Sequence, residues 1–342
     1  MADVARAAGV STMTVSYAYS QPGRVSESAA AKIRAAAEQL GYSGPHPGAS
    51  ALRRGRAGTL GVVLGEHLAY AFQDPQAARF FAGVAEVCAA EDVGITLVPV
   101  TGASDDTERI GRAAVDGFVV WTTADDDPVL DAVLATGLPT AVHGGPHRAG
   151  IPIVSIDDRA AARAIGQVAF SLARRPAVLS FPLDRERRSL LVAGLDPQFA
   201  AFPVTRHRLQ GLRDAWVETG RSWSEVRVAV CSRNDATLGA AHAADLLHSR
   251  KAPDAIAAMS DELALGALQA ARDAKLHVPD ALAVTGWDDS DAAAPAGLTT
   301  VRQSLRDQGA QCARLALGLS DENNQPSWQL VHRRTTRTPP AD

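Results

Sequence analysis

The first 45 residues alternate short apolar faces with residues that cap or break helices, which predicts three short helices. The predicted spans are 3–8, 12–20 and 27–40. Gly9 ends the first helix, whereas Ser11 and Ser26 are suitable N-caps for the second and the third. The short interval between the first two helices has the length of the turn in a helix-turn-helix motif.

The second predicted helix has one apolar face and one face of short polar and aromatic side chains. Val15 and Tyr19 are expected to point inward. The residues of the outer face are Thr12, Met13, Ser16 and Tyr17. Hydroxyl groups bind phosphates or base edges, and Met and Tyr side chains contact thymine methyl groups in a major groove. The alternative is a three-helix core whose outer face is only solvated.

A connection follows the third helix. Residues 43–48 are rich in glycine and proline, which is typical of a linker. One or two helical turns are then predicted over 49–54, where Leu52 is the only large apolar residue and arginines follow it. An apolar wedge beside basic residues suits insertion into a minor-groove base step. A protease-sensitive linker with ordinary surface charges is the alternative.

From Thr59 onward, short apolar runs alternate with helical patterns. Strands are predicted at 60–64, 95–100, 117–121, 140–143, 153–156, 177–181, 226–231, 255–259 and 282–287. Helices are predicted between most of them, for example over 75–91, 160–172, 208–219, 236–247 and 262–273. This alternation predicts parallel sheets with right-handed crossovers, in two doubly wound lobes. The segment 183–202 fits neither pattern and is a candidate lid or partner surface.

Polar residues follow several predicted strands, at the edge where open α/β sheets bind their ligands. They are Asp157 and Asp158, Asn234 and Asp235, Ser260 and Asp261, and Asp288 and Asp289. Carboxylates and amides that face one cleft suit a ligand rich in hydroxyl or amino groups. Asp and Asn residues also cap helices, and for Asp235 and Asp261 capping is an equally good explanation.

The distribution of charge changes the conclusion that net charge alone would give. The 342 residues include 34 basic and 38 acidic side chains, and the net charge of −4 argues against a nucleic-acid ligand. Residues 1–57, however, carry +4, which leaves −8 on the remainder. A small basic head on an acidic body suits contact between the head and a polyanion. A chance asymmetry of surface charge is the alternative.

Several classes of protein are not supported by the sequence. The chain has an ordinary globular composition, with 46% hydrophobic residues, and shows neither a membrane-spanning apolar run nor a signal-peptide pattern. Its three distant cysteines favour a reducing cytoplasm, and its histidines lack metal-ligand spacing. Nucleotide-binding glycine motifs and a Gly-x-Ser-x-Gly elbow are absent, and His143-Gly144-Gly145 has no matching nucleophile. We therefore expect no enzyme, cofactor or metal site.

At this point the sequence resembles the lactose-repressor/galactose-repressor (LacI/GalR) family of transcriptional regulators. The resemblance is carried by residues 3–16, 24–26 and 40–42 and by the hinge run 49–63, and it extends to about residue 335. It implies an α/β chain with an N-terminal helix-turn-helix head and a two-lobed core of doubly wound parallel sheets, similar to periplasmic sugar-binding proteins.

The resemblance also implies a division of the chain. The head would span residues 1–45, the hinge 46–57 and the effector-binding and dimerisation core 58–342. Lobe 1 would hold about 58–157 and 288–318, and lobe 2 about 158–287 and 319–342.

Two sets of functional residues follow from the resemblance. The implied base-reading residues are Thr12, Met13 and Tyr17. The implied phosphate-contacting residues are Thr14, Ser16 and Arg24, and Leu52 matches the leucine that enters the minor groove. The implied effector-binding residues are Tyr70, Phe72, Asp74, Arg208, Asn234, Asp261, Asp288 and Gln303.

The implied function is that of a cytoplasmic repressor that binds a palindromic DNA operator as a homodimer and has no membrane contact. A small molecule in the cleft would control it, with a sugar or sugar derivative as the first expectation and a nucleoside or carboxylated ligand as others. No C-terminal leucine heptad is visible, which favours a dimer over a tetramer. The alternative is a cytoplasmic small-molecule binding protein with a degenerate head, because His46 and Gly48 differ from the residues usual in the family's hinge.

Overall fold

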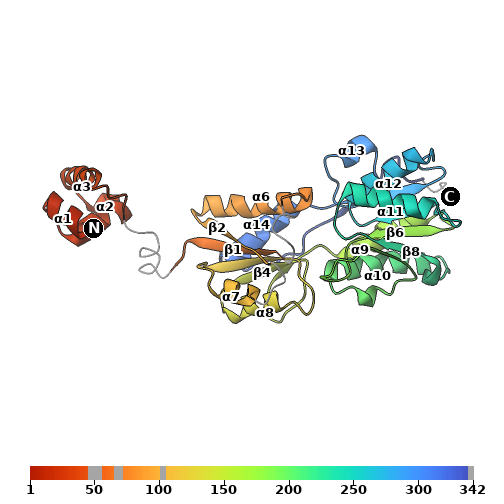
Figure 1. Ribbon diagram of the computed structural model, residues 1–342, viewed down its shortest axis with the longest axis horizontal. Coiled ribbons are helices and arrows are strands. Elements are labelled where there is room, and N and C mark those ends of the chain that lie inside the picture. Colours follow the sequence, from red (N-terminus) through yellow and green to blue (C-terminus); the bar gives the residue numbers. More distant parts are fainter. Residues whose placement is uncertain (45–55, 65–71, 101–104, 338–342) are drawn as a thin grey trace. The chain divides into compact units, whose positions relative to one another are not determined.

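The computed structural model describes residues 1–44, 56–64, 72–100 and 105–337 (Figure 1). The chain divides into two compact units, Met1–Gly58 and Thr59–Asp342. The expected minor-groove residue Leu52, most of the expected hinge and the expected effector residue Tyr70 lie outside the described residues.

The first unit is a three-helix head. Its elements are α1 (Ala2–Ala8), α2 (Thr12–Ser20), the 3-10 turn η1 (Pro22–Arg24) and α3 (Glu27–Gln39). Gly9 ends α1 in the left-handed region (φ 66°), and the Ser11 hydroxyl accepts the Thr14 N–H at the start of α2 (3.0 Å). The Ser26 hydroxyl accepts the Ala29 N–H in the same way at the start of α3. The expected helices and caps are therefore present.

The core of the head is small and consists mostly of alanine and short branched side chains. The buried residues are Val4, Ala5, Ala8, Val15, Ile33, Ala36 and Ala37. Val15 is fully buried, as expected, but the expectation for Tyr19 is wrong, because this side chain is 37% exposed. Its ring packs edge-on against Tyr42 (5.9 Å between centroids) beside the core instead of entering it.

The second unit contains two α/β lobes. Lobe 1 is built on a parallel sheet of order β2-β1-β3-β4-β5. Its strands are β1 (Thr59–Leu64), β2 (Gly94–Val98), β3 (Gly117–Trp121), β4 (Thr140–His143) and β5 (Ile153–Val154). One face is covered by α6 (Pro75–Ala90) and α14 (Leu305–Ala316), and the other by α7 (Asp106–Gly111) and α8 (Pro128–Ala135) (Figure 1).

Lobe 2 is built on a sheet of order β10-β9-β6-β8-β7. Its strands are β6 (Pro176–Ser180), β7 (Leu190–Ala193), β8 (Arg227–Val230), β9 (Ala255–Ala258) and β10 (Ala283–Thr285). The helices α9 (Asp158–Phe170) and α10 (Pro203–Val217) cover one face, and α11 (Ala236–Leu247) and α12 (Asp261–Asp273) the other. Shorter elements are η2 (Pro197–Phe199), η3 (Trp223–Glu225) and α13 (Ala293–Ala296).

The segment 183–202 departs from the expected all-parallel pattern. Its β7 runs antiparallel to β8 at the edge of the sheet. Leu190 and Val192 pack on the lobe 2 core, whereas Leu191 between them is 50% exposed. All four residues of β7 are apolar, so the inward–outward alternation of an edge strand is hidden in the sequence.

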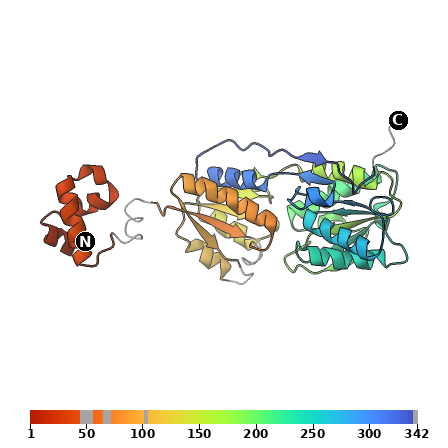
Figure 2. The same ribbon diagram turned by 90° about the horizontal axis from the view of Figure 1, so that it is seen from above.

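The chain returns from lobe 2 to lobe 1 later than expected. After β10, the chain continues beside the lobe 2 sheet through β11 (Thr300–Arg302), which pairs antiparallel with β12 (Gln329–Val331). It enters α14 only after Arg302, whereas the sequence predicts the boundary at 288. Figure 2 shows the segment that then returns from α14 to β12.

Two glycines allow α6 and α14 to touch backbone to backbone. A Cβ atom on Gly83 would lie 1.8 Å from the Arg306 carbonyl oxygen, and one on Gly309 would lie 2.1 Å from the Phe80 carbonyl oxygen. Since a real Cβ never approaches so closely, this pair of helices depends on both glycines. Their contact fixes α14, which carries part of the site described next.

Candidate functional site

The candidate DNA-reading residues of the head lie on one helix and the turn after it. Thr12 and Met13 are exposed near the start of α2, and Met13 is 62% exposed. The Arg24 guanidinium lies over the Tyr17 ring (5.6 Å), which holds an aromatic and a cationic group side by side. The two residues can therefore act as a single polar–aromatic contact surface.

The surface of α2 suits a polyanion. The helix contains no acidic residue, and its N-terminal amides carry the positive end of the helix dipole. The Thr14 hydroxyl is hydrogen-bonded to Ser11 (2.8 Å), and Ser16 is partly buried, so these two polar groups lie closer to the helix backbone than Thr12 and Met13.

A cavity of the second unit collects side chains from the carboxyl ends of strands in both lobes. Of the residues expected to bind an effector, five line it: Asp74, Arg208, Asn234, Asp288 and Gln303. Asp158, which the sequence places at a strand end, also lines the cavity. Further lining residues were not expected from the sequence, among them Trp121, His143, Phe181, Arg187 and Gln308.

Arg208 of α10 is held firmly in the wall of the cavity. Its Nε donates to the Asp158 carboxylate (2.8 Å) and its Nη1 to the Met259 carbonyl oxygen (2.7 Å). The guanidinium stacks over the Trp287 ring, 4.0 Å from the centroid. Because both charges are buried, the pair needs these additional contacts to offset its desolvation.

Asp288 faces Arg208 across the cavity wall and is set in a strained backbone. Its φ of 102° lies in the left-handed region, where a side chain is unfavourable, and such strain is common at ligand sites. Burial raises the pKa of its carboxyl group to about 7, although the nearby Arg208 charge and a hydrogen bond from Gln303 (2.7 Å) oppose this shift. The carboxyl group therefore gives up its proton far less readily than an exposed aspartate.

Asp74 and Asn234 meet across the two lobes. One carboxylate oxygen of Asp74 caps α6 by accepting the Gln76 N–H (2.8 Å), and the other accepts the Asn234 side-chain amide (3.3 Å). The Asn234 oxygen in turn accepts the Ser260 hydroxyl. The cavity is therefore closed on this side by a direct polar contact between lobes.

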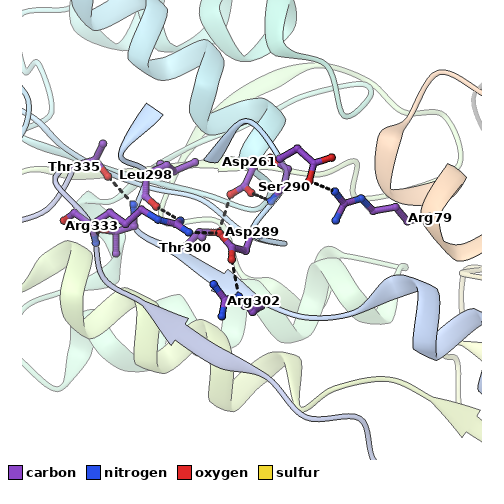
Figure 3. A network of polar contacts seen from close by, with 11 residues as sticks. Arg79, Asp261, Asp289, Ser290, Leu298, Thr300, Arg302, Arg333 and Thr335 are labelled. Atoms are coloured by element: carbon purple, nitrogen blue, oxygen red, sulfur yellow. Dashed lines mark hydrogen bonds and ion pairs between the residues drawn. The ribbon is translucent and has the colours of Figure 1, made fainter. Parts of the chain in front are cut away.

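Two expected effector residues lie outside the cavity wall. Phe72 is 71% exposed and does not line the cavity. Asp261 is 1% exposed and is not among the lining residues, and its carboxylate accepts the Ser290 N–H (2.6 Å) and the Thr300 hydroxyl (2.7 Å) (Figure 3). Burial raises the pKa of Asp261 to about 6, and these two hydrogen bonds oppose the shift.

The same region anchors the chain crossing between the lobes. Asp289, next to Asp288, accepts hydrogen bonds from Arg302 and Arg333 (both 2.6 Å) (Figure 3). On the lobe 1 side, Arg79 of α6 pairs with Asp291 (2.7 Å). These contacts fix the backbone that carries Asp288.

Trp121 and His143 form an aromatic wall on lobe 1. Their rings stack with centroids 4.6 Å apart and an angle of 15° between planes. Burial lowers the pKa of His143 to about 4, so the ring is neutral at pH 7. Both residues end parallel strands, and the rule that ligands bind at strand ends would have found them. Gln308, on α14, has no such signal in the sequence.

The described residues contain no cluster of His, Cys, Asp and Glu that could hold a metal ion. Among them, no helix is long and apolar enough to cross a membrane.

Two family models match the chain. The model of bacterial regulatory proteins of the lacI family matches residues 1–44, and the model of a periplasmic binding protein-like domain matches residues 183–337. The HTH-type transcriptional regulator Rv3575c of Mycobacterium tuberculosis is 36% identical over 93% of this chain and 90% of that protein.

Solved structures agree with these matches. A LacI-family transcriptional regulator from Corynebacterium glutamicum has 29% identity, a TM-score of 0.76 and 98% of each chain covered. The structure of a transcriptional regulator CelR–cellobiose complex has 25% identity and a TM-score of 0.66, with 97% of this chain and 98% of that chain covered.

Proposed function

Because the chain belongs to the LacI family of HTH-type transcriptional regulators, we propose that it is a repressor whose hold on DNA is controlled by a small polyhydroxylated molecule. It acts in the cytoplasm as a homodimer, and each head binds one half of a palindromic operator. The main support is a cavity that is lined by residues of both lobes and contains the buried Arg208–Asp158 ion pair together with Asp288.

The DNA-binding part of the proposal rests on α2 and η1. Thr12, Met13 and Tyr17 read base edges in the major groove, while Arg24 and the helix N-terminus contact phosphates. The hydroxyl groups of Thr14 and Ser16, which lie closer to the helix backbone, contact DNA phosphates that approach the helix. For Leu52, we infer insertion into the minor groove from the family resemblance alone.

The effector class follows from the charges and surfaces of the cavity. Asp158 compensates Arg208, and burial keeps Asp288 partly protonated, so no strong excess of one sign remains to select an ion. In the described part of the chain, Arg208 uses its Nε and Nη1 for side-chain hydrogen bonds, which leaves Nη2 to donate to a ligand. A hydroxyl group that accepts from Arg208 and donates to Asp288 satisfies both.

Two aromatic side chains of the cavity support a sugar as the ligand. Trp121 and Phe181 offer apolar faces to the C–H face of a ring whose hydroxyl groups point to the polar side chains. A similar fold carries cellobiose in the CelR complex, which supports a carbohydrate for this chain as well.

Effector binding couples to DNA through the relative position of the lobes. A ligand that touches Trp121 of lobe 1 and Arg208 of lobe 2 stabilises the arrangement in which the two are close. By linkage, a ligand that shifts this arrangement changes operator affinity, and operator DNA changes effector affinity by the same factor.

The DNA-binding proposal is tested by electrophoretic mobility shift of DNA from the protein's own promoter region. We expect binding at least about 1000-fold tighter to one site in that region than to random DNA. Equal affinity for both would instead favour a small-molecule binding protein with a degenerate head.

The effector proposal is tested by a thermal-shift screen over mono- and disaccharides, sugar alcohols and nucleosides. A ligand that binds only the folded core raises its melting temperature. Replacement of Asp288 by Asn should reduce the stabilisation by a ligand found in the screen, whereas replacement of the exposed Phe72 by Ala should not. Stabilisation by nucleosides alone would refute the carbohydrate assignment.

A further inference from the structure

A chain of buried and partly buried side-chain hydrogen bonds connects Asp288 to lobe 1. The Gln303 amide donates to Asp288 Oδ1 (2.7 Å), and the Gln308 amide donates to Gln303 Oε1 (3.0 Å). His143 Nε2 lies 3.0 Å from Gln308 Oε1. These residues come from the segment after β10, the crossing before α14, α14 itself and the end of β4.

With an ionised Asp288 as the terminal acceptor, every bond in this chain points in the same direction. The Gln308 amide nitrogen is the donor to Gln303, so its oxygen is the acceptor that faces His143. His143 Nε2 must therefore carry a hydrogen. In a neutral ring Nδ1 is then an unprotonated acceptor, and it is buried without a hydrogen-bond partner in the described structure.

The surroundings keep this arrangement rigid. Gln308 is 1% exposed, and the helix that carries it is fixed against α6 by the close backbone contacts at Gly83 and Gly309. His143 packs against both Trp121 and Phe80. Neither amide can turn over alone without placing two donors or two acceptors against each other, which is costly in a site with little access to water.

We propose that Gln308 and His143 are positioning residues for Asp288: through Gln303 they hold one carboxyl oxygen inside the protein and present the other to the effector. The assignment of Asp288 to effector binding rests on the proposed function, but the hydrogen-bond chain itself does not. Since Gln308 and His143 belong to lobe 1 and Asp288 follows a strand of lobe 2, the chain also couples the effector-facing carboxyl group to lobe 1.

Asp288 and His143, at the two ends of the hydrogen-bond chain, are also influenced by other charged groups. A test must separate the effect of these groups from the effect of Gln308. Asp288 is influenced by Arg208, Asp261 and Asp74 as well as by Gln303. His143 is influenced by Asp158 and Arg208 as well as by Gln308. A substitution at Gln308 leaves all of these ionisable groups in place.

The test is a pH titration of the full chain without ligand. NMR of ¹³C-labelled Asp carboxyl groups and ¹⁵N-labelled His rings monitors the titration. Asp288→Asn assigns the Asp288 signal. In the unmodified chain we expect the His143 ring to be the Nε2–H tautomer, without protonation above pH 5. An Nδ1–H ring would overturn the proposal by itself, whatever the variants do.

Two substitutions of Gln308 have different expected results. Gln308→Leu removes the oriented donor to Gln303, so the Asp288 midpoint should move upward and His143 should lose its single tautomer. Gln308→Glu keeps an acceptor for His143 but adds a negative charge, so the midpoints of His143 and Asp288 should both rise.

The control is Gln311→Leu on the same helix, where the amide contacts only the Asn324 carbonyl among the described residues. It should leave both signals unchanged. If the two Gln308 variants fold and also leave both signals unchanged, the positioning role is excluded. A ligand screen without hits would contradict the proposed effector class, but it would not affect the result expected from this titration.

Discussion

Single side chains show how far burial changes the chemistry of this cavity. His143 is neutral because burial lowers its pKa to about 4, while Asp288 is partly neutral because burial raises its pKa to about 7. Arg208 forms a buried ion pair with Asp158 (2.8 Å). The residues that line the cavity therefore carry fewer charges than their side-chain types suggest.

Asp288→Asn tests this assignment through stability. Between its ordinary pKa near 4 and the folded value of about 7, Asp288 binds its proton more tightly in the folded chain, so stability falls as pH rises through this window. The variant does not have this pH-dependent decrease. We expect its melting temperature, relative to the unmodified chain, to rise by several degrees between pH 4 and pH 8.

Thermal unfolding across that pH range measures the difference. Asp261 and His143 also titrate. Because both proteins contain them, their contributions to the difference in melting temperature largely cancel. A difference in melting temperature that is constant with pH would show that Asp288 ionises normally.

At the scale of elements, helix contacts and one irregular segment decide how the cavity is built. The pairs of helices that cover each sheet pack closely, and Gly83 and Gly309 bring α6 and α14 into backbone contact. The segment 183–202 adds an edge strand and then reaches lobe 1, where the Asp125 N–H donates to the Ala201 carbonyl oxygen (3.0 Å).

Gly83→Ala tests the contact of α6 with α14. The added methyl group would collide with the Arg306 backbone, so we expect a decrease of about 1–3 kcal/mol in the free energy of unfolding. The control is Gly111→Ala in α7, where nothing lies within 4 Å of the new Cβ atom. Urea denaturation compares the two, and equal effects would contradict the packing argument.

Arg206→Glu tests the polar contact that follows the segment 183–202. Arg206 of lobe 2 donates to Asp125 of lobe 1 (2.5 Å) and to the Ala200 carbonyl oxygen (2.8 Å). A glutamate would repel Asp125, so we expect the lobes to spend more time apart, and Asp125→Arg in the same chain should restore part of the closure.

The measurement is small-angle scattering, or energy transfer between a label on each lobe. Arg213→Glu is the control, because Arg213 pairs with Asp196 inside lobe 2 (3.6 Å). If Arg206→Glu leaves the distance between lobes unchanged, this contact does not hold them closed.

At the scale of the whole molecule, the division of charge matters more than its sum. The net charge of −4 combines a basic head with a body of −8. We expect such a body to limit non-specific attraction to DNA and to leave binding to the head.

Salt dependence of DNA binding tests this division. We expect affinity to fall steeply with salt. Arg24→Ala should weaken binding to all sequences alike and reduce the salt slope by about one, because one phosphate is no longer neutralised by this side chain. Arg6→Ala is the control, because Arg6 pairs with Asp3 on α1 (3.1 Å). The measurement is affinity between about 50 and 200 mM salt. An unchanged slope for Arg24→Ala would show that this residue does not bind a phosphate.

The sequence by itself determined the features that depend on local physics. Capping residues such as Ser11 and Ser26 fixed the helices of the head, and apolar runs bounded by turns fixed most strands of the lobes. Strand ends pointed to Asp288 and Asn234, because parallel strands bring their carboxyl ends to one edge. Family motifs added Arg208 and Gln303 to the same site.

Only the tertiary structure decided which of those groups meet. Gln308 enters the site because two glycines allow α14 to approach α6, and Asp261 leaves it because Ser290 and Thr300 bind its carboxylate outside the cavity. The edge strand β7 and the return to lobe 1 after Arg302 likewise depend on pairing between distant segments. Such contacts join residues far apart in the chain, and no local pattern of hydrophobic and polar positions records them.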